Sequence, residues 1–276
     1  MNEHRPRIGI QVRTQGPQST RDMIVDCAMA AEQNGFEELY VVDHIAIPPD
    51  DLEGSDGRYL DPLSVLSFLA GLTDQIELCT GVLVMPYRSI LPTAKVIATA
   101  QELSGNRLKL GVGVGWMESE FKALGIDRAR RGRIFDEGLE FINRAFASDQ
   151  ISQNDQEFMF LPRPAKPPIL IGGTPPYAFD RAVKFGDGWI PMAGKNLEKF
   201  RAPISELKER FASAGKKEPQ VAIFTRLAYE QPATMVEQMQ EMADIGVSSM
   251  VHGGVRYRDS SEFSEIAEAI SSSRAL

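Results

Sequence analysis

Residues 105–116, GNRLKLGVGVGW, contain the pattern on which the fold prediction depends. Within them, residues 107–115 form a short and mostly apolar run, which is typical of a strand buried on both faces of a parallel sheet. Gly105-Asn106 is a typical stop for a preceding helix, which we expect over residues 92–104. A second helix is expected after the run, over residues 133–147. The stretch therefore predicts one unit of a parallel α/β fold, a strand followed by a helix.

The same alternation continues along the whole chain. Seven more strands are expected, over residues 7–12, 38–44, 75–84, 168–173, 188–192, 221–229 and 247–252. The other helices are expected over residues 19–34, capped by Ser19, and over residues 62–73, 177–185, 197–214, 234–245 and 260–271. Eight units in 276 residues, roughly 34 residues each, fit a closed (β/α)8 TIM barrel better than an open doubly wound sheet. We expect one domain over residues 1–276, with irregular loop insertions at residues 46–61 and 148–167.

Composition and charge exclude several classes of protein. A hydrophobic content of 43% with 25% charged residues is that of a globular chain. The net charge of −8, without a Lys/Arg-rich block, argues against nucleic acid binding. No apolar run is long enough for a membrane span, and residues 1–10 lack the apolar part of a secretory signal. Because two cysteines are also too few for a zinc site, we expect a cytoplasmic protein without metal, membrane or nucleic acid partners.

Two histidines stand at the carboxyl ends of expected strands, where TIM barrels carry their active sites. His44 is the leading candidate because an imidazole can act as acid, base or hydrogen-bond donor near neutral pH. The alternative is a histidine that only packs at the strand end. Asp43 beside it either orients a neighbouring group or, as we favour, bonds loop amides. His252 has an equivalent position next to two glycines.

Glycines alternate along the strand at residues 107–115. Gly111, Gly113 and Gly115 do not form a dinucleotide-binding fingerprint, because the third glycine of G-x-G-x-x-G would fall at Trp116. One face of this strand instead carries no side chains, which leaves room for a flat molecule. The alternative is close packing inside the barrel.

A second group of small residues, Gly172-Gly173-Thr174, joins an expected strand to a helix. Such a junction offers backbone N–H groups and the positive end of a helix dipole to a phosphate. Pro175 and Pro176 remove two donors, and a plain turn is the alternative. The chain also lacks the H-E-x-x-H and G-x-S-x-G patterns of metalloproteases and hydrolases. Strand ends rich in Gly, Val, Met and Trp favour a bulky, flat and partly apolar cofactor.

Taken together, several motifs resemble the luciferase-like monooxygenase family, and most closely its branch of coenzyme F420-dependent oxidoreductases. They cover nearly the whole chain in order: Asn34-Gly35-Phe36, Asp43-His44, Gly81 with Pro86-Tyr87-Arg88 and Ala94-Lys95, LSGNR at 103–107, GVGVGWMESEFKALG at 111–125, Arg131-Gly132-Arg133, Asp136-Glu137, IGG at 171–173 and GDGW at 186–189.

The resemblance implies a barrel that holds FMN or F420 at its mouth, with His44 as the catalytic residue. It places a non-prolyl cis peptide at Gly81–Val82, supporting the cofactor ring. It also implies ring contacts from Gly113 and Gly115, and phosphate contacts from Gly172, Gly173 and Thr174. Some F420-dependent dehydrogenases of the family carry a catalytic carboxylate directly after the glycines of the strand that corresponds to residues 107–115, where this chain has Trp116.

The sequence therefore predicts a flavin- or deazaflavin-dependent oxidoreductase acting on an unidentified small organic substrate. FMN would imply a partner flavin reductase and O₂ activation, and F420 would imply direct hydride transfer. The alternatives are a flavin-binding barrel without turnover and a phosphosugar isomerase or aldolase, which would need a lysine or carboxylate base at a strand end. Family members often dimerise, so the resemblance leaves room for a homodimer.

Overall fold

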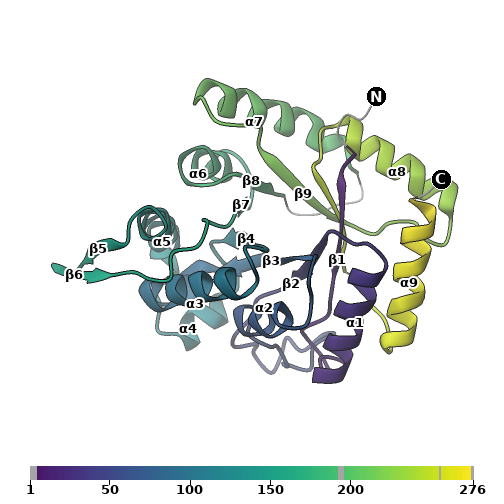
Figure 1. The fold of residues 1–276 in the computed structure, drawn as a ribbon, viewed down its shortest axis with the longest axis horizontal. Helices are drawn as coiled ribbons and strands as arrows, with labels where there is room; N and C mark the ends of the chain where they lie inside the picture. The colour runs from purple at the N-terminus through teal and green to yellow at the C-terminus, as the bar shows by residue number, and fades with distance from the viewer. Residues whose placement is uncertain (1–4, 192–195, 255, 275–276) are drawn as a thin grey trace.

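The computed structural model describes residues 5–191, 196–254 and 256–274. Eight parallel strands close into a barrel in the order β1-β10-β9-β8-β7-β4-β3-β2, so that each barrel strand pairs with the next one along the chain (Figure 1). This confirms the predicted (β/α)8 architecture. The barrel strands are β1 Arg7–Gln11, β2 Glu38–Val41, β3 Glu77–Val84, β4 Leu108–Gly113, β7 Ile169–Gly172, β8 Gly188–Ile190, β9 Gln220–Thr225 and β10 Ser249–His252.

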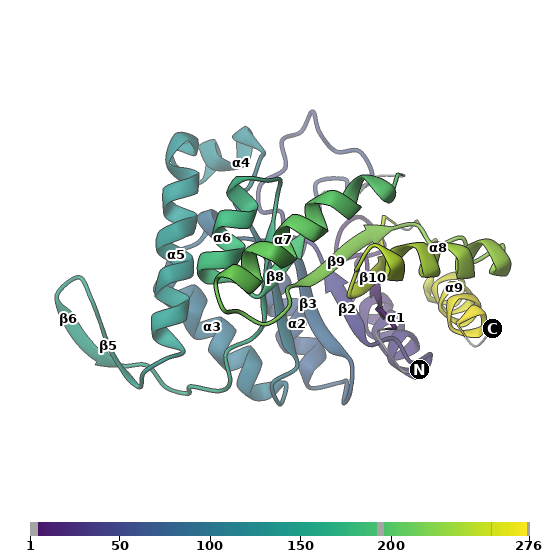
Figure 2. The same cartoon turned by 90° about the horizontal axis from the view of Figure 1, so that it is seen from above.

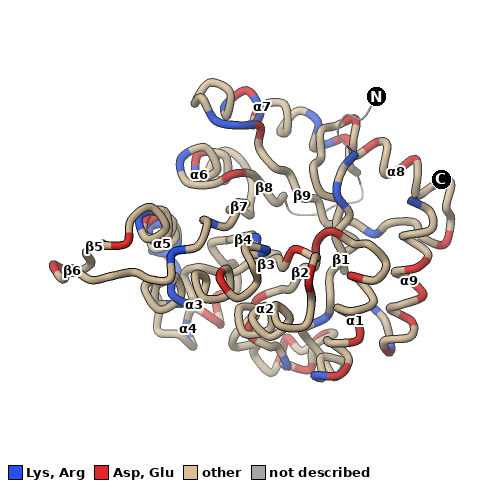
Figure 3. Tube along the Cα trace, in the orientation of Figure 1, with Lys and Arg blue, Asp and Glu red and all other residues tan. Residues whose placement is uncertain are grey.

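Helices surround this barrel. They are α1 Arg21–Gln33, α2 Pro62–Ala70, α3 Ile90–Leu103, α4 Glu118–Ala123, α5 Arg131–Ala145, α6 Tyr177–Phe185, α7 Arg201–Ser213, α8 Pro232–Asp244 and α9 Ser260–Ser273, with single 3₁₀ turns at η1 Met85–Tyr87, η2 Arg128–Arg130 and η3 Glu198–Phe200. No helix in the described part of the chain is long and apolar enough to cross a membrane. Basic and acidic residues are interspersed over most of the helices and loops (Figure 3).

The expected cap of the first helix is wrong by one residue. Thr20 is the N-cap of α1, and its hydroxyl oxygen accepts a hydrogen bond from the Met23 amide at 3.3 Å. Ser19 is engaged elsewhere, because its hydroxyl donates to the Gly16 carbonyl at 2.7 Å and accepts from Arg58 Nε at 2.9 Å.

Several strands are shorter than expected. The strand predicted over residues 38–44 ends at Val41, and the one predicted over residues 221–229 ends at Thr225. The strand predicted over residues 188–192 ends at Ile190, and Met192 lies outside the described residues. Ladder pairing stops at the barrel mouth, so the remaining apolar residues of these runs continue into loops above the barrel.

The two expected loop insertions differ in structure. Residues 148–167 are not irregular throughout, because β5 Gln150–Gln153 and β6 Gln156–Met159 form an antiparallel hairpin that projects away from the barrel (Figure 2). Its turn residues Asn154 and Asp155 have φ angles of 50° and 59°, as a two-residue hairpin turn requires. Residues 46–61 contain neither a helix nor a strand, apart from a bridge between Gln15 and Tyr59.

Candidate active site

The predicted site residues lie at one end of the barrel. His44 and Gly115 follow the ends of β2 and β4, Gly173 follows β7, and His252 is the last residue of β10. Because all barrel strands are parallel, these four positions share the rim at the carboxyl ends of the strands. The expected juxtaposition is therefore confirmed.

At this rim, His44 contacts a carboxylate that comes from a different part of the chain. Its Nδ1 lies 3.0 Å from Oε2 of Glu120, a residue of the short helix α4 that follows β4. The His44 side chain is 20% exposed, whereas that of Glu120 is completely buried. The pair therefore has one partner facing the mouth and one buried behind it.

Glu120 accepts four hydrogen bonds. Besides His44, its carboxylate oxygens accept from the amides of Ile45 at 2.6 Å and Ala46 at 3.1 Å, and from the Tyr87 hydroxyl at 2.7 Å. Burial alone would raise the pKa of Glu120, but the donors at His44, Ile45, Tyr87 and Ala46 outweigh it and lower this pKa to about 2. The carboxylate is therefore ionised at neutral pH and can act only as an acceptor.

This assignment fixes the tautomer of His44. Because ionised Glu120 has no proton to give, His44 must donate through Nδ1–H, which leaves the lone pair of neutral His44 on Nε2. Among the described residues no hydrogen bond to that Nε2 is found. The imidazole is thus held from behind and presents an atom that can accept a proton.

Aromatic rings flank His44. The ring centroid of Tyr59 lies 4.9 Å from that of His44, and the Trp116 centroid lies at 6.1 Å in an edge-to-face arrangement. Trp116 is 65% exposed and Ile45 is 45% exposed. The imidazole therefore has aromatic neighbours on the side of the mouth, and one of them, Trp116, is largely exposed.

Asp43 combines the two roles considered for it. Its carboxylate accepts from the Val84 amide at 2.7 Å and forms a two-pronged contact with the Arg88 guanidinium, at 2.6 and 2.8 Å. Arg88 also contacts Asp61, the N-cap of α2, at 2.9 Å. This network joins the ends of β2 and β3 to α2 and so fixes the chain on both sides of His44.

The cis peptide that the resemblance implies on β3 is present, and it lies within a bulge. The peptide bond between Gly81 and Val82 is cis, and the pairing of β3 with β4 shifts register between Thr80 and Leu83. The bulge directs Val82 across the mouth, where its side chain packs with Phe224 against the residues that fill the barrel interior. A Cβ atom on Gly113 would lie 2.8 Å from Val82 Cγ2, and one on Gly172 would lie 3.1 Å from Val82 Cγ1.

The expectation that the glycine face of β4 stays open is therefore wrong along most of its length. A Cβ atom on Gly111 would lie 2.2 Å from the Thr80 carbonyl oxygen, so this glycine serves close packing inside the barrel. Gly113 makes room for Val82, and Gly115 lies against Val84 and Phe121. The half-buried Val82 side chain, rather than bare backbone, lines this part of the mouth.

The turn at Gly172-Gly173-Thr174 has backbone N–H groups that could donate hydrogen bonds to a ligand. Gly173 has a φ of +122°, which favours glycine, and its amide makes only a long hydrogen bond of 3.4 Å to the Ile190 carbonyl. No partner is found for the Thr174 amide among the described residues, and Thr174 is exposed. The nine-residue helix α6 begins just beyond it, after a cis bond between Pro175 and Pro176.

His252 points away from the barrel interior. Its neighbour Val251 belongs to the interior cluster, so His252 faces the loop after β9, where its Nδ1 accepts from the Leu227 amide at 3.1 Å. Burial and the nearby charge of Arg226 lower the pKa of His252 to about 4. This histidine is neutral at pH 7 and lies outside the group formed by His44 and Glu120.

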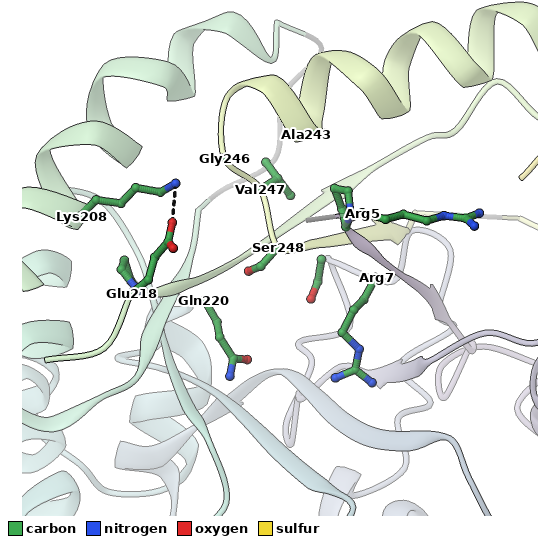
Figure 4. Close-up of a pocket in the computed structure, with 12 residues that line it drawn as sticks. Arg5, Arg7, Lys208, Glu218, Gln220, Ala243, Gly246, Val247 and Ser248 are labelled. Carbon is green, nitrogen blue, oxygen red and sulfur yellow. Dashed lines mark ion pairs between the residues drawn. The ribbon is translucent and has the colours of Figure 1, made fainter. Parts of the chain in front are cut away.

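The opposite end of the barrel carries a second buried carboxylate and a cavity of about 740 Å³. There Lys109 Nζ lies 2.5 Å from Glu38 and 2.9 Å from Glu77, and Arg7 lies 2.6 Å from Glu77. Lys208 at the cavity wall is paired with Glu218 at 2.6 Å (Figure 4). The charges at this end are thus largely matched by one another.

Sequence reasoning missed Glu120. It stands in the stretch 111–125 on which the resemblance rests, but we looked for a carboxylate directly after the β4 glycines and found Trp116. The chain turns after β4 into α4, and this turn brings the buried Glu120 into contact with His44. The available signal was its place within that stretch, directly before the apolar Phe121.

Comparisons with known proteins agree with the barrel fold. The family model for luciferase-like monooxygenases matches residues 7–275. An uncharacterized protein of Mycobacterium tuberculosis is 29% identical over 249 residues, which cover 82% of this chain and 85% of that protein. The monooxygenase RslO1 of Streptomyces bottropensis has the same fold, with a TM-score of 0.80 at 18% identity over 96% of this chain and 98% of that one.

Two further relatives carry named activities. An FMNH₂-dependent dimethylsulfone monooxygenase of Pseudomonas putida is 27% identical over 68% of this chain, and an F420-dependent hydroxymycolic acid dehydrogenase of M. tuberculosis is 28% identical over 67%. The matched segments span only 53% of each of these proteins. The match of the family model over residues 7–275 shows that the chain belongs to the luciferase-like monooxygenase family and is an oxidoreductase.

Proposed function

We propose that this protein binds FMN or coenzyme F420 at the carboxyl end of the barrel and oxidises or reduces a small organic substrate there, with His44 as the residue that exchanges a proton. The observation that carries the proposal is the pair of His44 and Glu120, which leaves Nε2 of His44 without a partner among the described residues at the mouth. Relatives that depend on FMNH₂ and on F420 support both cofactors.

The residues at the mouth fit such a cofactor. The half-buried Val82 side chain, held by the bulge and flanked by Gly113 and Gly172, offers an apolar surface to a flat ring. The Thr174 amide and the backbone of Gly173 offer donors to a phosphate at the start of α6. When bound, the ring system would supply hydride transfer or, as reduced FMN, oxygen activation.

The protein's own contribution is the handling of a proton. Neutral His44 can accept a proton at Nε2, and the imidazolium that results stays beside the ionised carboxylate of Glu120 at 3.0 Å. Glu120 acts as a positioning residue, because it orients the imidazole and the backbone at Ile45 and Ala46. A positioned acid or base of this kind contributes about 10²–10⁴-fold to a rate.

The described residues at the mouth favour this proposal over the two alternatives. An isomerase or aldolase would use a lysine or carboxylate base at the mouth, but Lys109 is buried with Glu38 and Glu77 near the amino ends of the strands. Glu120 is a poor base because its pKa is lowered to about 2. A flavin-binding barrel without turnover would not require the imidazole of His44 to be oriented by a buried carboxylate.

The partners follow from the cofactor. If the cofactor is FMN, a flavin reductase would have to deliver it in the reduced form. If the cofactor is F420, hydride would pass directly between F420 and the substrate. A homodimer is also proposed, through exposed apolar side chains of the adjacent helices α2 and α3 and of the turn that follows α2, which are Phe68, Leu72, Val96 and Leu103. A monomer by light scattering at micromolar concentration would contradict it.

Absorbance and fluorescence titrations of the protein with FMN and, separately, with F420 test the proposal. We expect saturable binding of at least one, with a change in the ring spectrum. Gly173→Asp should weaken that binding by about 1–3 kcal/mol, because it places a negative charge where the phosphate is expected. No spectral change with either cofactor would overturn the proposal, and an unchanged Gly173→Asp affinity would place the phosphate elsewhere.

A further inference from the structure

The two tryptophans of the chain have opposite surroundings. Trp189 is 2% exposed and its indole N–H donates to the Gly173 carbonyl at 2.8 Å, whereas Trp116 is 65% exposed and its indole N–H has no partner among the described residues. The Trp116 ring lies edge to face with that of His44, with centroids 6.1 Å apart. A single exposed apolar side chain is ordinary in a folded protein. This one, however, lies against the imidazole that the proposed function uses.

The backbone on both sides of Trp116 is held by packing. Gly115 has a φ of +76°, and a Cβ atom there would lie 2.7 Å from Val84 Cγ1, so the chain passes close to the end of β3. Met117 is buried and is the N-cap residue of α4. The same short helix carries Glu120, which orients the imidazole. The Trp116 side chain is therefore presented from a fixed backbone, next to an imidazole that is held by the same helix.

Tyr59 supplies a second aromatic ring beside His44, with centroids 4.9 Å apart and the ring planes inclined at 57°. It comes from the loop at residues 46–61, but its own position in that loop is fixed. Tyr59 forms a backbone bridge with Gln15, and the amide of the next residue, Leu60, donates to the Thr14 carbonyl at 3.0 Å. The half-buried Tyr59 ring is thus anchored to the loop after β1.

The charged groups next to the imidazole are already paired. Glu120 is buried and accepts four hydrogen bonds, and Asp43 forms its two-pronged contact with Arg88. Ile45 adds an apolar side chain that is 45% exposed. A charged substrate group placed beside the two aromatic rings would lose its water without gaining a counter-charge from these residues. An apolar chain or ring in the same place would be removed from water at no such cost.

We propose that Trp116 and Tyr59 bind the hydrocarbon part of an uncharged substrate, an alcohol, aldehyde or ketone with an apolar chain, and that Trp116 determines the preference for that chain. The oxygen of the substrate would then face Nε2 of His44, the atom left without a partner among the described residues. This inference rests on the proposed function, because it takes Nε2 as the atom that exchanges a proton with the substrate.

Ligand-observed NMR titrations test the inference, on the protein with the cofactor that binds and on the cofactor-free protein. The probes are the primary alcohols from 1-propanol to 1-hexanol, together with hexanoate and hexylammonium, which place opposite charges on a chain of the same length. Affinity for the alcohols should rise about two- to fourfold with each added methylene, since burying one supplies up to about fourfold. Hexanoate and hexylammonium should each bind at least about tenfold more weakly than 1-hexanol, because their charges would have to be desolvated.

Trp116→Ala should weaken 1-hexanol binding by about fivefold or more and 1-propanol binding by less than about twofold, so that the dependence on chain length becomes flatter. Trp116→Phe keeps an aromatic ring and should retain most of the native preference. The affinity for the cofactor and the melting temperature should stay close to those of the native protein, because the Trp116 side chain is largely exposed.

Met159→Ala is the matched control, because Met159 is 59% exposed but lies on the hairpin of β5 and β6, which projects away from the barrel. It should change 1-hexanol affinity by less than about twofold. Affinity that does not depend on chain length, charged probes that bind as tightly as 1-hexanol, or equal losses in Trp116→Ala and Met159→Ala would overturn the inference while cofactor binding is intact. Failure of both cofactors to bind would instead overturn the proposed function.

Discussion

The two ends of the barrel each bury a glutamate, and they satisfy it with different partners. At the amino end, Glu38 accepts from Lys109, Tyr40 and Ser249, with the amine of Lys109 only 2.5 Å away. At the mouth, Glu120 accepts from two amides, a phenol and an imidazole. A permanent cation closes the first site, whereas a partner that can gain and lose a proton keeps the second available for chemistry.

The same difference extends to the surroundings. The basic and acidic groups at the amino end are largely paired, as with Lys208 and Glu218. At the mouth, Nε2 of His44 and the cations of η2 have no such partners among the described residues. This contrast agrees with our proposal that the amino end stabilises the fold and that the mouth binds the ligand. The predictions below test this division.

The largest effect is expected at the amino end. Lys109→Met would leave Glu38 buried beside Tyr40 without its main cation, which costs about 3–5 kcal/mol in the free energy of unfolding. Urea denaturation of the variant and of the native protein measures this loss. The double variant Glu38→Gln/Lys109→Met should recover part of the loss, because the unpaired charge is gone. A loss below about 1 kcal/mol in the single variant would mean that this end is not a structural ion cluster.

At the mouth, His44→Asn should act on turnover instead. Asparagine keeps a polar side chain but cannot exchange a proton, so kcat with the best substrate from a panel of alcohols, aldehydes and ketones should fall about a hundredfold or more. Cofactor affinity and melting temperature should change little. His252→Asn is the matched control and should leave kcat within about threefold, because His252 faces away from the interior. Retained turnover with lowered stability would make His44 part of the scaffold.

Glu120→Gln should have a smaller effect on the same step. The single amide oxygen of glutamine is needed by the Ile45 and Ala46 amides, so the amide nitrogen, which cannot accept, faces His44 Nδ1–H. The imidazole then loses a hydrogen bond to a charged group, worth about 1.5–3 kcal/mol. We expect kcat to fall roughly 10- to 100-fold, while the affinity for the cofactor stays close to that of the native protein. The same substitution at exposed Glu118 should have no effect. If cofactor affinity and kcat fell by the same factor, Glu120 would have a structural role rather than a role in positioning His44.

The smallest effect concerns acid stability. Unfolded His252 takes up a proton near pH 6.5, but the folded protein holds its pKa at about 4, so stability is lost as the pH falls from 6.5 toward 4. The contribution of Glu120 to stability changes at a lower pH than that of His252. It is fully present above pH 4.5 and is lost as the pH falls toward 2, because the pKa of Glu120 is lowered in the folded protein. Denaturation at pH 7 and 4.5 should show a smaller difference for His252→Asn than for the native chain. An equal difference would contradict the assignment.

The sequence predicted the barrel because buried parallel strands leave a local signature, an apolar run before each amphipathic helix. It predicted the positions of His44 and Gly173 for the same reason, since strand ends define the mouth. The cis bond at Gly81–Val82 came from the resemblance, because no local pattern specifies it. What stayed hidden depends on contacts between distant residues: Glu120 reaches His44 across 76 positions, and Lys109 reaches Glu38 across 71.

Some local signals were also overlooked. Asn154-Asp155 is a pair typical of a hairpin turn and could have predicted the hairpin of β5 and β6. We instead expected an irregular loop, because the residues around this pair are polar. Arg131 and Arg133 were used only as part of the resemblance, and the local excess of positive charge over residues 128–133 was not considered beside the net charge of −8. In contrast, no sequence rule would have shown that Val82 fills the face left open by Gly113, because that depends on the bulge.

The most direct test of the division between the two ends is a crystal structure of the protein with the cofactor that binds in the titrations. We predict its ring against Val82 at the mouth, within reach of Nε2 of His44, and its phosphate at the amides of Gly173 and Thr174. Density for the cofactor in the cavity at the amino ends, beside Arg7 and Lys208, would contradict the account.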